Sequence, residues 1–243
     1  MPHLSIVIPA YNEVGRLPKT LARMVPFLRM QSFSFEIVVV DDGSRDGTVE
    51  RITALQKEVP ELRLISDGVN RGRGAAVKKG IFEAHGDIVL ETDSDGSVAD
   101  EAIPRFVARF DAEAELDAIF GSRMMKDSHI VVWQPLVRTM LGYGFLYLAR
   151  VMFWMWRTTD FTLGFKMYRR TAALDIFTHQ FDPFYVAEAE KVFVANVRRH
   201  TTIELPVTWT DDPDSRVKPV RDTIRALWGM FQILGRYFAG SYR

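Results

Sequence analysis

The sequence predicts an α/β fold with a mostly parallel sheet flanked by helices. Over the first 120 residues, short apolar segments alternate with segments of helical periodicity, which is the pattern of successive βαβ units. The segment Glu36-Ile-Val-Val-Val-Asp-Asp is apolar without alternation, as expected of a strand buried on both faces of a parallel sheet. The length of 243 residues suits a single domain of this class.

The elements of the first 60 residues are predicted from their periodicity. Leu4 begins a strand that Pro9 ends. A helix is expected over 14–30, because Leu17, Leu21, Met24, Val25 and Leu28 share one face. The second strand is 36–42, and Asp46-Gly47-Thr48 opens a helix that runs to about Lys57.

The same alternation continues to residue 120. We expect strands over 62–66, 87–92 and 116–120, with helices over 74–85 and 100–110 between them. Neither an internal repeat nor a low-complexity linker is visible, so we expect one domain, 1–243. Within it we distinguish 1–120 and 121–220, followed by a C-terminal amphipathic helix at 221–243.

Composition excludes several classes of function. Lys plus Arg and Asp plus Glu each total 31, so net charge gives no hint of a nucleic-acid partner. Cysteine is absent, which excludes disulfides, thiol catalysis and thiolate metal sites. The apolar segment at 4–10 is short and no signal-peptide cleavage site follows it.

Residues 121–170 combine basic, aromatic and apolar side chains. The segment holds eight Lys and Arg residues against two Asp, a net charge of +6, together with ten aromatic residues. Its longest charge-free run, 139–149, is shorter than the roughly 18–20 apolar residues that span a bilayer. We therefore expect 130–157 to form two amphipathic helices lying in a membrane interface; the alternative is a buried core helix. The C-terminal segment 221–243 has a similar mixture, and either packs on the protein or contacts the membrane.

Two carboxylates follow the strand at 87–92. Asp93 and Asp95 are separated by one small residue, and ligands bind beyond the carboxyl ends of strands in open α/β sheets. Such a pair suits a hard divalent cation that also holds substrate phosphates. The alternative is an ordinary acidic turn, since Asp, Ser and Gly are common turn residues.

Other strand ends carry polar residues as well. After the first strand, Tyr11 could stack on a base and Glu13 could accept from a ribose or base. Asp41 and Asp42 follow the second strand, where a carboxylate can accept hydrogen bonds from a nucleoside. Helix capping is the alternative, and Asp46 could supply it without either residue.

Basic residues recur at the predicted helix start near residue 73 and in the second half. Asn70-Arg-Gly-Arg-Gly-Ala-Ala-Val-Lys-Lys-Gly favours anions at a helix N-terminus, although it matches neither a dinucleotide fingerprint nor a P-loop; a solvated basic helix is the alternative. Arg123 could clamp a phosphate as a planar fork. Glu188 and Glu190 are two positions apart on a predicted helix, so at most one of them points into a site.

In order, these segments resemble the family 2 glycosyltransferases of GT-A fold. The matching segments are Pro9-Ala-Tyr-Asn-Glu, Asp41-Asp-Gly-Ser, Asn70-Arg-Gly-Arg-Gly-Ala-Ala and Asp93-Ser-Asp. The second half is similar to dolichyl-phosphate glucosyltransferases and related polyprenyl-phosphate mannosyltransferases, through Gly121-Ser-Arg, Asp160…Gly164-Phe-Lys, Glu190 and Glu204-Leu-Pro-Val-Thr-Trp…Ser215. Asp93-Ser-Asp-Gly is closer to the glucosyl branch.

The resemblance implies that 1–120 binds the nucleotide sugar and that 121–220 binds the acceptor, and it implies roles for particular residues. Asp93 and Asp95 would hold Mg²⁺ or Mn²⁺, and they would be catalytic together with Arg123 and Arg138. The acceptor would be bound by Arg123, Arg138, Lys166 and Glu190. The nucleotide sugar would be bound by Pro9, Ala10, Tyr11, Glu13, Asp41, Asp42, Gly72, Lys78, Asp93 and Ser94. The chain departs from the family pattern at Glu188-Ala-Glu190 and at Phe161 and Leu163.

The implied function is transfer of a hexose, glucose in preference, from UDP-glucose or GDP-mannose to a polyprenyl or dolichyl phosphate. The implied location is the cytoplasmic face of a membrane, as a peripheral protein with no nucleic-acid partner. Two alternatives remain at this stage: a family 2 enzyme with a non-lipid acceptor such as a polysaccharide, and a catalytically silent module that binds nucleotide sugars.

Overall fold

The structure is a computed structural model that describes residues 1–132, 136–184, 186–211 and 219–243, with only the backbone described for 136–138, 141 and 219–224. Its strands are β1 (Leu4–Ala10), β2 (Phe35–Asp41), β3 (Leu62–Ser66), β4 (Ile88–Glu91), β5 (Ala118–Ser122), β6 (His129–Val132), β7 (Lys166–Arg169), β8 (Thr202–Pro206) and β9 (Thr208–Thr210). Its helices are α1 (Leu17–Arg29), α2 (Thr48–Leu55), α3 (Arg73–Glu83), α4 (Ala102–Ala112), α5 (Leu136–Phe153), α6 (Arg170–Thr178), α7 (Ala187–Val197) and α8 (Pro219–Phe238).

Seven strands form one mostly parallel sheet in the order β3-β2-β1-β4-β7-β5-β8. Strand β7 is antiparallel to both of its neighbours, β4 and β5, whereas the other pairs are parallel. Because β7 and β8 come from the second half of the chain and insert beside strands of the first half, one sheet runs through both halves. The predicted fold class is confirmed.

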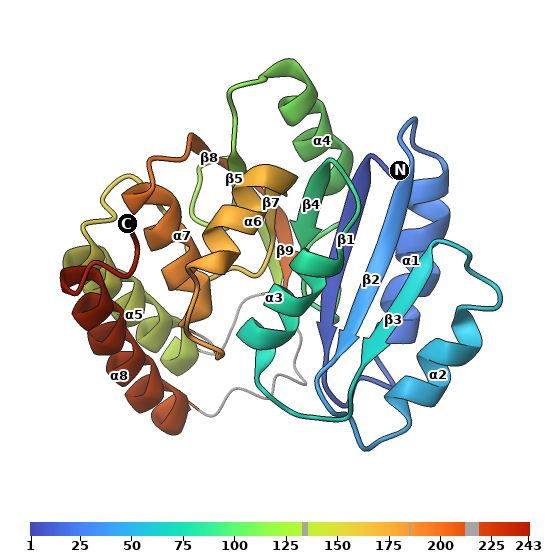
Figure 1. Ribbon diagram of the computed structural model, residues 1–243, viewed down its shortest axis with the longest axis horizontal. Coiled ribbons are helices and arrows are strands. Elements are labelled where there is room, and N and C mark those ends of the chain that lie inside the picture. Colours follow the sequence, from blue (N-terminus) through green and yellow to red (C-terminus); the bar gives the residue numbers. More distant parts are fainter. Residues whose placement is uncertain (133–135, 185, 212–218) are drawn as a thin grey trace.

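Helices cover both faces of this sheet (Figure 1). In β1, Ile6 and Ile8 belong to the core under α1 and α4, while Val7 points to the core under α3, α6 and α7. Val38 and Val40 of β2 join Val7 on that second side. Successive side chains of a strand point to opposite faces, so a strand buried on both sides must be apolar at every position. This explains the continuous apolar runs of the sequence.

Predicted and observed elements of the first 120 residues agree to within a few residues at their ends. The largest shift is at the start of α1, which begins at Leu17 with Pro18 in its first turn. Proline is favoured there because the first turn of a helix leaves its N–H groups without intrahelical partners. The tripeptide before it, 14–16, is a turn rather than helix.

The prediction of two helices over 130–157 was wrong. His129–Val132 is the strand β6, which pairs with β9, and a single helix, α5, follows. The helix ends at Phe153, and Trp154 has a left-handed backbone with φ of 55°. The pairing of β6 with a strand almost 80 residues away is not encoded in local periodicity, so sequence reasoning missed it.

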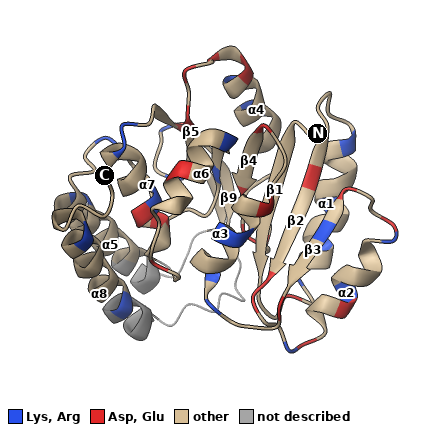
Figure 2. Ribbon diagram, in the orientation of Figure 1, with Lys and Arg blue, Asp and Glu red and all other residues tan. Residues whose placement is uncertain are grey.

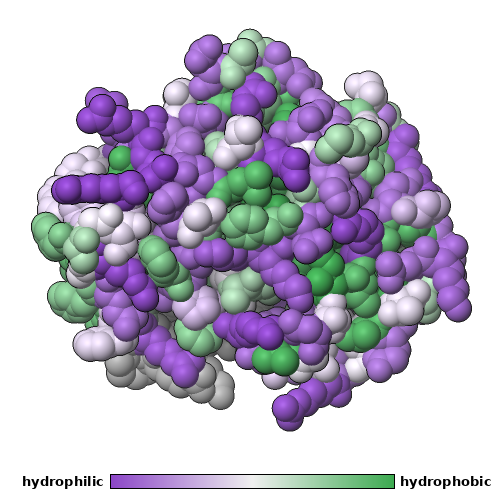
Figure 3. Space-filling model, viewed as in Figure 1, coloured by the Kyte–Doolittle hydropathy of each residue, from purple (hydrophilic) through white to green (hydrophobic). Residues whose placement is uncertain are grey.

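Helices α5 and α8 lie side by side at the edge of the molecule (Figure 1). Each buries one side in the core, through Leu146, Ala149 and Phe153 on α5 and Ala226, Met230 and Ile233 on α8. The exposed aromatic side chains of this region, here called the aromatic face, are Tyr143, Tyr147, Trp154, Trp156, Trp228, Phe231 and Phe238. In Figure 3 apolar and polar side chains intermix along this edge. Among the described residues, none of the helices is apolar enough over a sufficient length to traverse a bilayer.

Candidate active site

Acidic residues gather where three neighbouring parallel strands end. Ala10 of β1 is in register with Asp41 of β2, and β4 pairs with the other side of β1. Asp42 continues β2, and Asp93 and Asp95 follow β4. The carboxyl ends of these strands share one edge, which is where open α/β sheets bind ligands. Figure 2 shows that both signs of charge are otherwise interspersed over the elements.

Asp93 is held by an arginine from the start of α3. Arg73 Nε and Nη2 donate to Asp93 Oδ1 at 2.8 and 2.6 Å. Gly164 lies against this pair, since a Cβ on it would overlap Arg73 Nη2 and lie 2.5 Å from Asp93 Oδ2. The loop at 160–165 therefore approaches the Arg73–Asp93 pair so closely that a side chain at position 164 would displace these groups.

The acidic pair has the chemistry of a divalent cation site. Within the described part of the chain, Asp93 Oδ2 and Asp95 Oδ2 accept no hydrogen bond, while Asp95 Oδ1 accepts the N–H of Ser97 at 2.9 Å. No cluster of three or more His, Cys, Asp or Glu able to hold a metal occurs there either. Two carboxylates fit an ion such as Mg²⁺, which usually takes its remaining ligands from substrate phosphates and water.

The surroundings of Asp93 affect its protonation. The side chain is 41% exposed, yet the pKa of Asp93 lies above its ordinary value. Desolvation is the largest cause, and the charges of Asp95 and Glu188 act in the same direction, while Arg73 opposes them.

A chain of buried ion pairs lies behind Arg73. Arg73 Nη1 and Lys166 Nζ both pair with Glu188, and Lys191 Nζ donates to Glu188 Oε1 at 2.6 Å. Lys191 also pairs with Glu91 at 2.5 Å, and Glu91 accepts the hydroxyl of Tyr168 at 2.9 Å. The side chains of Lys166, Lys191 and Glu91 are fully buried.

Glu188 is the centre of this chain. Its Oε1 binds Arg73 and Lys191, and its Oε2 binds Lys166. Burial by itself would raise the pKa of Glu188, but Lys166, Lys191 and Arg73 together hold that pKa well below its ordinary value. A carboxylate so engaged is a poor general base, and its position makes it an anchor for the three cations.

Arg123, a predicted acceptor ligand, is bound by other protein groups. Its Nε and Nη2 donate to the two oxygens of Asp160 at 2.7 and 3.0 Å, and Nη2 also donates to Thr162. Its guanidinium lies 5.2 Å from the centre of the Trp209 ring. These contacts hold the loop that carries Gly164, and the charge of Asp93 contributes to raising the pKa of Arg123.

The residues predicted to bind the nucleotide line the loops after β1 and β2. Tyr11 is 41% exposed, and Glu13 is buried with its carboxylate on Arg16 at 2.6 and 2.7 Å. Asp41 accepts the N–H groups of Gly43 and Ser44 and the hydroxyl of Ser66. Asp46 accepts the N–H of Thr48, the first residue of α2, at 3.0 Å, while the N-cap position itself is Gly47.

Asp42, after β2, binds the backbone of the glycine-rich segment 70–80. It accepts the N–H of Arg71 at 2.7 Å and that of Gly72 at 2.9 Å. Burial raises the pKa of Asp42, and these two N–H groups counteract it. Gly72 has φ of 103°, and a Cβ there would overlap the carbonyl oxygen of Pro183, so the segment needs glycine at this position. Arg73 is thereby placed at the first turn of α3.

Three further predicted residues complete this edge. Pro9 and Ala10 are the last two residues of β1. Ser94 is buried, and its carbonyl oxygen accepts the hydroxyl of Thr20 at 2.9 Å. These contacts fix the backbone between Asp93 and Asp95.

Two predicted site residues lie in other contacts. Lys78 Nζ donates to the carbonyl oxygen of Gln180 at 2.8 Å. Glu190 is fully buried and accepts the N–H groups of Phe181 and Asp182 and the hydroxyl of Tyr242. Neither is brought together with Asp93. Lys166 lies in the buried chain behind it, and the side chain of Arg138 is outside the described residues.

Sequence reasoning did not assign Arg73, Glu188 or Gly164 to the site. Arg73 was one of several cations in the glycine-rich segment, and nothing local distinguishes it from Arg71. Glu188 and Glu190 differ only in which side of α7 they occupy. The glycine before Phe165-Lys166 was the available signal, because it marks a close approach of the backbone to another group.

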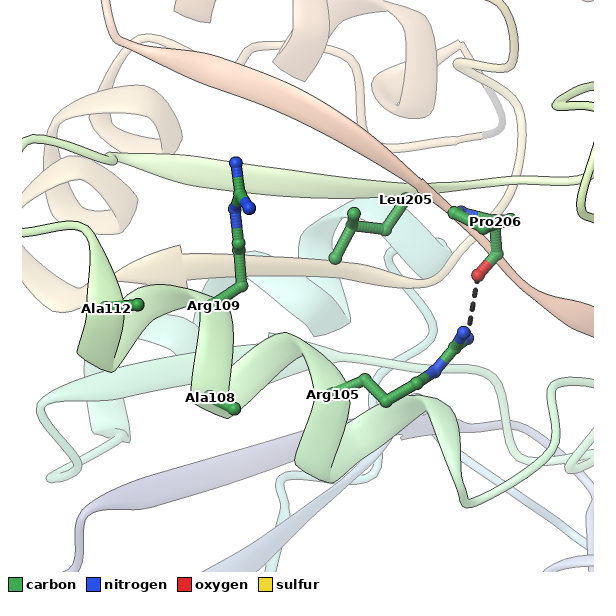
Figure 4. A pocket seen from close by; sticks show the side chains of 6 residues that line it. All are labelled: Arg105, Ala108, Arg109, Ala112, Leu205 and Pro206. Carbon is green, nitrogen blue, oxygen red and sulfur yellow. Dashed lines mark hydrogen bonds between the residues drawn. The ribbon is translucent and has the colours of Figure 1, made fainter.

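A separate groove lies between α4 and β8, on the other side of the sheet from α3 (Figure 4). Its walls are Arg105, Ala108, Arg109, Ala112, Leu205 and Pro206. Arg105 donates across it to the carbonyl oxygen of Pro206 at 2.8 Å. None of these lining residues carries a carboxylate, so the acidic residues at the carboxyl ends of β1, β2 and β4 are the better candidate for a catalytic site.

The comparisons with known proteins place the chain in a family. A model of glycosyl transferase family 2 matches residues 5–177. The chain belongs to glycosyl transferase family 2. The match contains the acidic pair, the glycine-rich segment and Gly164.

Several relatives in this family are similar over nearly the whole chain. A dolichyl-phosphate beta-glucosyltransferase of Dictyostelium discoideum is 30% identical, covering 99% of this chain and 76% of its own length. The Saccharomyces cerevisiae and Homo sapiens proteins of the same name are 30% and 29% identical, covering 99% of this chain and 76% and 77% of their own lengths.

Solved structures of similar fold confirm the predicted GT-A fold. Glucosyl-3-phosphoglycerate synthase from Mycobacterium tuberculosis in complex with UDP has a TM-score of 0.70 at 18% identity, covering 96% of this chain and 80% of that one. A mannosyltransferase from Pyrobaculum calidifontis in complex with GDP-Man and Mn²⁺ has a TM-score of 0.62 at 19% identity, covering 98% and 64%.

Proposed function

We propose that this chain transfers a hexose, glucose in preference, from a nucleotide sugar to a polyprenyl phosphate such as dolichyl phosphate, with inversion at the sugar. One observation carries the proposal. The acidic pair after β4 occurs in a chain whose relatives, named dolichyl-phosphate beta-glucosyltransferases, cover 99% of it. UDP-glucose is the donor we favour because those names specify glucose; GDP-mannose is the other candidate.

The donor half of the site lies at the carboxyl ends of β1, β2 and β4, here called the strand edge. Tyr11, Glu13 and Asp41 are placed to meet the nucleoside, and Asp93 and Asp95 to meet its diphosphate. A divalent cation held by these two carboxylates would offset the charge that grows on the departing diphosphate. The Mn²⁺ in similar structures supports an ion of this kind.

A phosphate acceptor removes the need for a strong general base. Its second pKa is about 6, so it is largely ionised at pH 7. This agrees with Glu188, whose oxygens are occupied by Arg73, Lys166 and Lys191. The work of the protein is then to orient the two anions so that an acceptor oxygen attacks in line with the leaving diphosphate. Arg123 and Arg138 remain the candidates that orient the acceptor, Arg123 through its Nη1, because its Nε and Nη2 donate to Asp160.

The aromatic face supports a lipid acceptor. Trp154, Trp156 and Trp228 are 56, 62 and 67% exposed, although large aromatic side chains usually bury most of their surface. Tryptophan and neighbouring basic residues favour the boundary between lipid and water. We propose that α5 and α8 rest on the membrane surface and bring the acceptor phosphate to the strand edge.

The test is a donor screen with purified protein and a short polyprenyl phosphate. UDP-glucose, GDP-mannose and UDP-N-acetylglucosamine are each supplied with Mn²⁺ or with a chelator, and glycolipid is measured by mass spectrometry. We expect a cation-dependent glucolipid with UDP-glucose. Transfer from none of the three donors to the lipid would contradict the proposal.

Replacing one metal-site carboxylate gives the matched variant. We expect Asp95→Ala to lower transfer by at least about a hundredfold, the scale of losing one group that stabilises transition-state charge. The control is Asp127→Ala, an exposed carboxylate in the loop between β5 and β6, which should transfer at the wild-type rate. Normal turnover by Asp95→Ala in the presence of Mn²⁺ would contradict the proposed mechanism.

A further inference from the structure

Arg73 occupies the position at which a cation would neutralise Asp93. Two of its nitrogens lie 2.6 and 2.8 Å from Asp93 Oδ1, and only 20% of its side chain is exposed. Its third nitrogen is bound by Glu188 from α7. Arg73 therefore bridges an acidic residue of the proposed metal site and a buried acidic residue outside it.

The buried chain behind Arg73 is balanced in charge. Asp93, Glu188 and Glu91 provide three negative charges, and Arg73, Lys166 and Lys191 provide three positive ones. A bound divalent cation adds two charges at Asp93. Arg73 binds only Oδ1 of Asp93, so a cation on Oδ2 would share the carboxylate with Arg73, and the two positive charges would repel each other.

We propose that Arg73, anchored by Glu188, is a positioning residue that sets the affinity of the acidic pair for its divalent cation. Arg73 holds Asp93 in place as a resident counter-charge and weakens cation binding. Glu188 acts through Arg73, because a guanidinium whose positive charge is partly offset by Glu188 offsets less of the negative charge of Asp93. This inference rests on the proposed function, because it assumes that Asp93 and Asp95 hold a cation.

The inference predicts opposite effects for two residues of one ion pair. Removing the charge of Arg73 removes the cation that contacts Asp93, so cation affinity rises. Removing the charge of Glu188 releases Arg73 to Asp93 and makes the site more positive, so cation affinity falls. A merely structural role would move both variants in the same direction, toward weaker binding.

The experiment titrates the purified full chain with Mn²⁺ alone and follows free Mn²⁺ by electron paramagnetic resonance. We expect Arg73→Gln to lower the Kd for Mn²⁺ about tenfold or more, since a unit charge is removed within a few ångströms of the site. Arg73→Lys keeps the charge and should stay within about threefold of wild type. Glu188→Gln should raise the Kd.

Matched controls exist for both variants. Arg71→Gln removes the same charge from the same segment, where Arg71 pairs with Asp67 at 2.6 Å, and it should leave the Kd unchanged. Glu190→Gln alters a buried glutamate on the same helix as Glu188, and it too should leave the Kd unchanged. Circular dichroism establishes folding, and if Glu188→Gln does not fold, Arg73→Gln and Arg73→Lys decide the question alone.

The outcomes separate this inference from the proposed function. Loss of Mn²⁺ binding in Asp95→Ala with tighter binding in Arg73→Gln supports both. If Asp95→Ala loses Mn²⁺ but Arg73→Gln binds it equally or more weakly, the role of Arg73 is overturned and the metal site stands. If wild type binds Mn²⁺ no better than Asp95→Ala, the metal site itself fails.

Discussion

At the scale of single residues, a charged side chain can bind a substrate or form an ion pair that stabilises the fold. Arg123 was predicted to clamp a phosphate, and in the structure both oxygens of buried Asp160 occupy its guanidinium. An ion pair of this kind is costly to break, because the remaining charge stays buried without compensation. Arg123 and Asp160 therefore contribute to the position of the 160–165 loop whether or not a substrate is bound.

Asp160→Asn tests this contribution through its dependence on pH. Burial would raise the pKa of Asp160, but Arg123 holds that pKa below its ordinary value. A lowered folded-state pKa stabilises the protein fully above the unfolded pKa of about 3.9, and this stabilisation is lost as pH falls through the folded value. Urea unfolding should show a loss of about 3–5 kcal/mol at pH 7 and a smaller difference from wild type below about pH 4.

The control for this prediction is Asp127→Asn, which changes an exposed carboxylate nearby. Its free energy of unfolding should stay within about 0.5 kcal/mol of wild type at both pH values. A difference between Asp160→Asn and wild type that does not shrink in acid would show that the ion pair is not its source.

Gly164→Ala tests the close approach of the loop to the acidic pair. The new methyl group would overlap Arg73 Nη2 and press on Asp93 Oδ2. Both are ends of flexible side chains, so they can move apart at modest cost to stability. We expect transfer to fall about tenfold or more, because small displacements of positioned groups are expensive in rate, while the urea midpoint changes little. The measurements are the rate of glucolipid formation and urea unfolding; the control is Gly142→Ala, where a Cβ meets nothing within 4 Å.

At the scale of elements, what the sequence could predict depends on how local the determining contacts are. Strands β1 to β5 and helices α1 to α4 follow from periodicity, since each buries a face that its own residues define. Strand β7 inserts antiparallel between β4 and β5, and β6 pairs with β9. Those pairings depend on contacts between segments that are far apart in the sequence, so the pattern of residues within one short segment cannot predict them.

The candidate site divides in the same way. The carboxylates at the ends of β2 and β4 were predictable because a strand end fixes their position. The pairing of Lys191 with Glu91 joins residues 100 positions apart, and Arg73 reaches Glu188 over 115 positions. Which of two glutamates on α7 faces the site is a matter of how that helix is rotated, and this is set by packing on α3 and α6.

Helix α8 offers a direct test of the aromatic face. Trp228 and Phe231 are 67 and 62% exposed, and burying each in a lipid interface would contribute at most about 1.5–3 kcal/mol. The double variant Trp228→Glu/Phe231→Glu should weaken binding to anionic vesicles about tenfold or more in a flotation assay. Met30→Glu, at an exposed apolar residue just after α1, is the control and should float like wild type. Equal flotation of all three proteins would contradict a lipid role for α8.

At the scale of the whole molecule, the last residues of the chain pack back into the core against α7. Tyr242 is buried, and its ring packs against Phe181 and Phe193. Its hydroxyl donates to Glu190, which stands two residues from Glu188 on α7. Helix α7 thus connects the proposed metal site on one side with α8 and the chain end on the other.

Tyr242→Phe tests this tie with the loss of one oxygen atom. The variant keeps the ring contacts but leaves Glu190 buried without its hydroxyl donor, which costs about 1–3 kcal/mol. In a domain of this size Tm falls by about 2–4 °C for each kcal/mol, which differential scanning calorimetry resolves. Tyr147→Phe removes an equivalent hydroxyl from a side chain that is 69% exposed, and its Tm should match wild type. If Tyr242→Phe melted together with Tyr147→Phe, the hydroxyl would not be what fastens the chain end to α7.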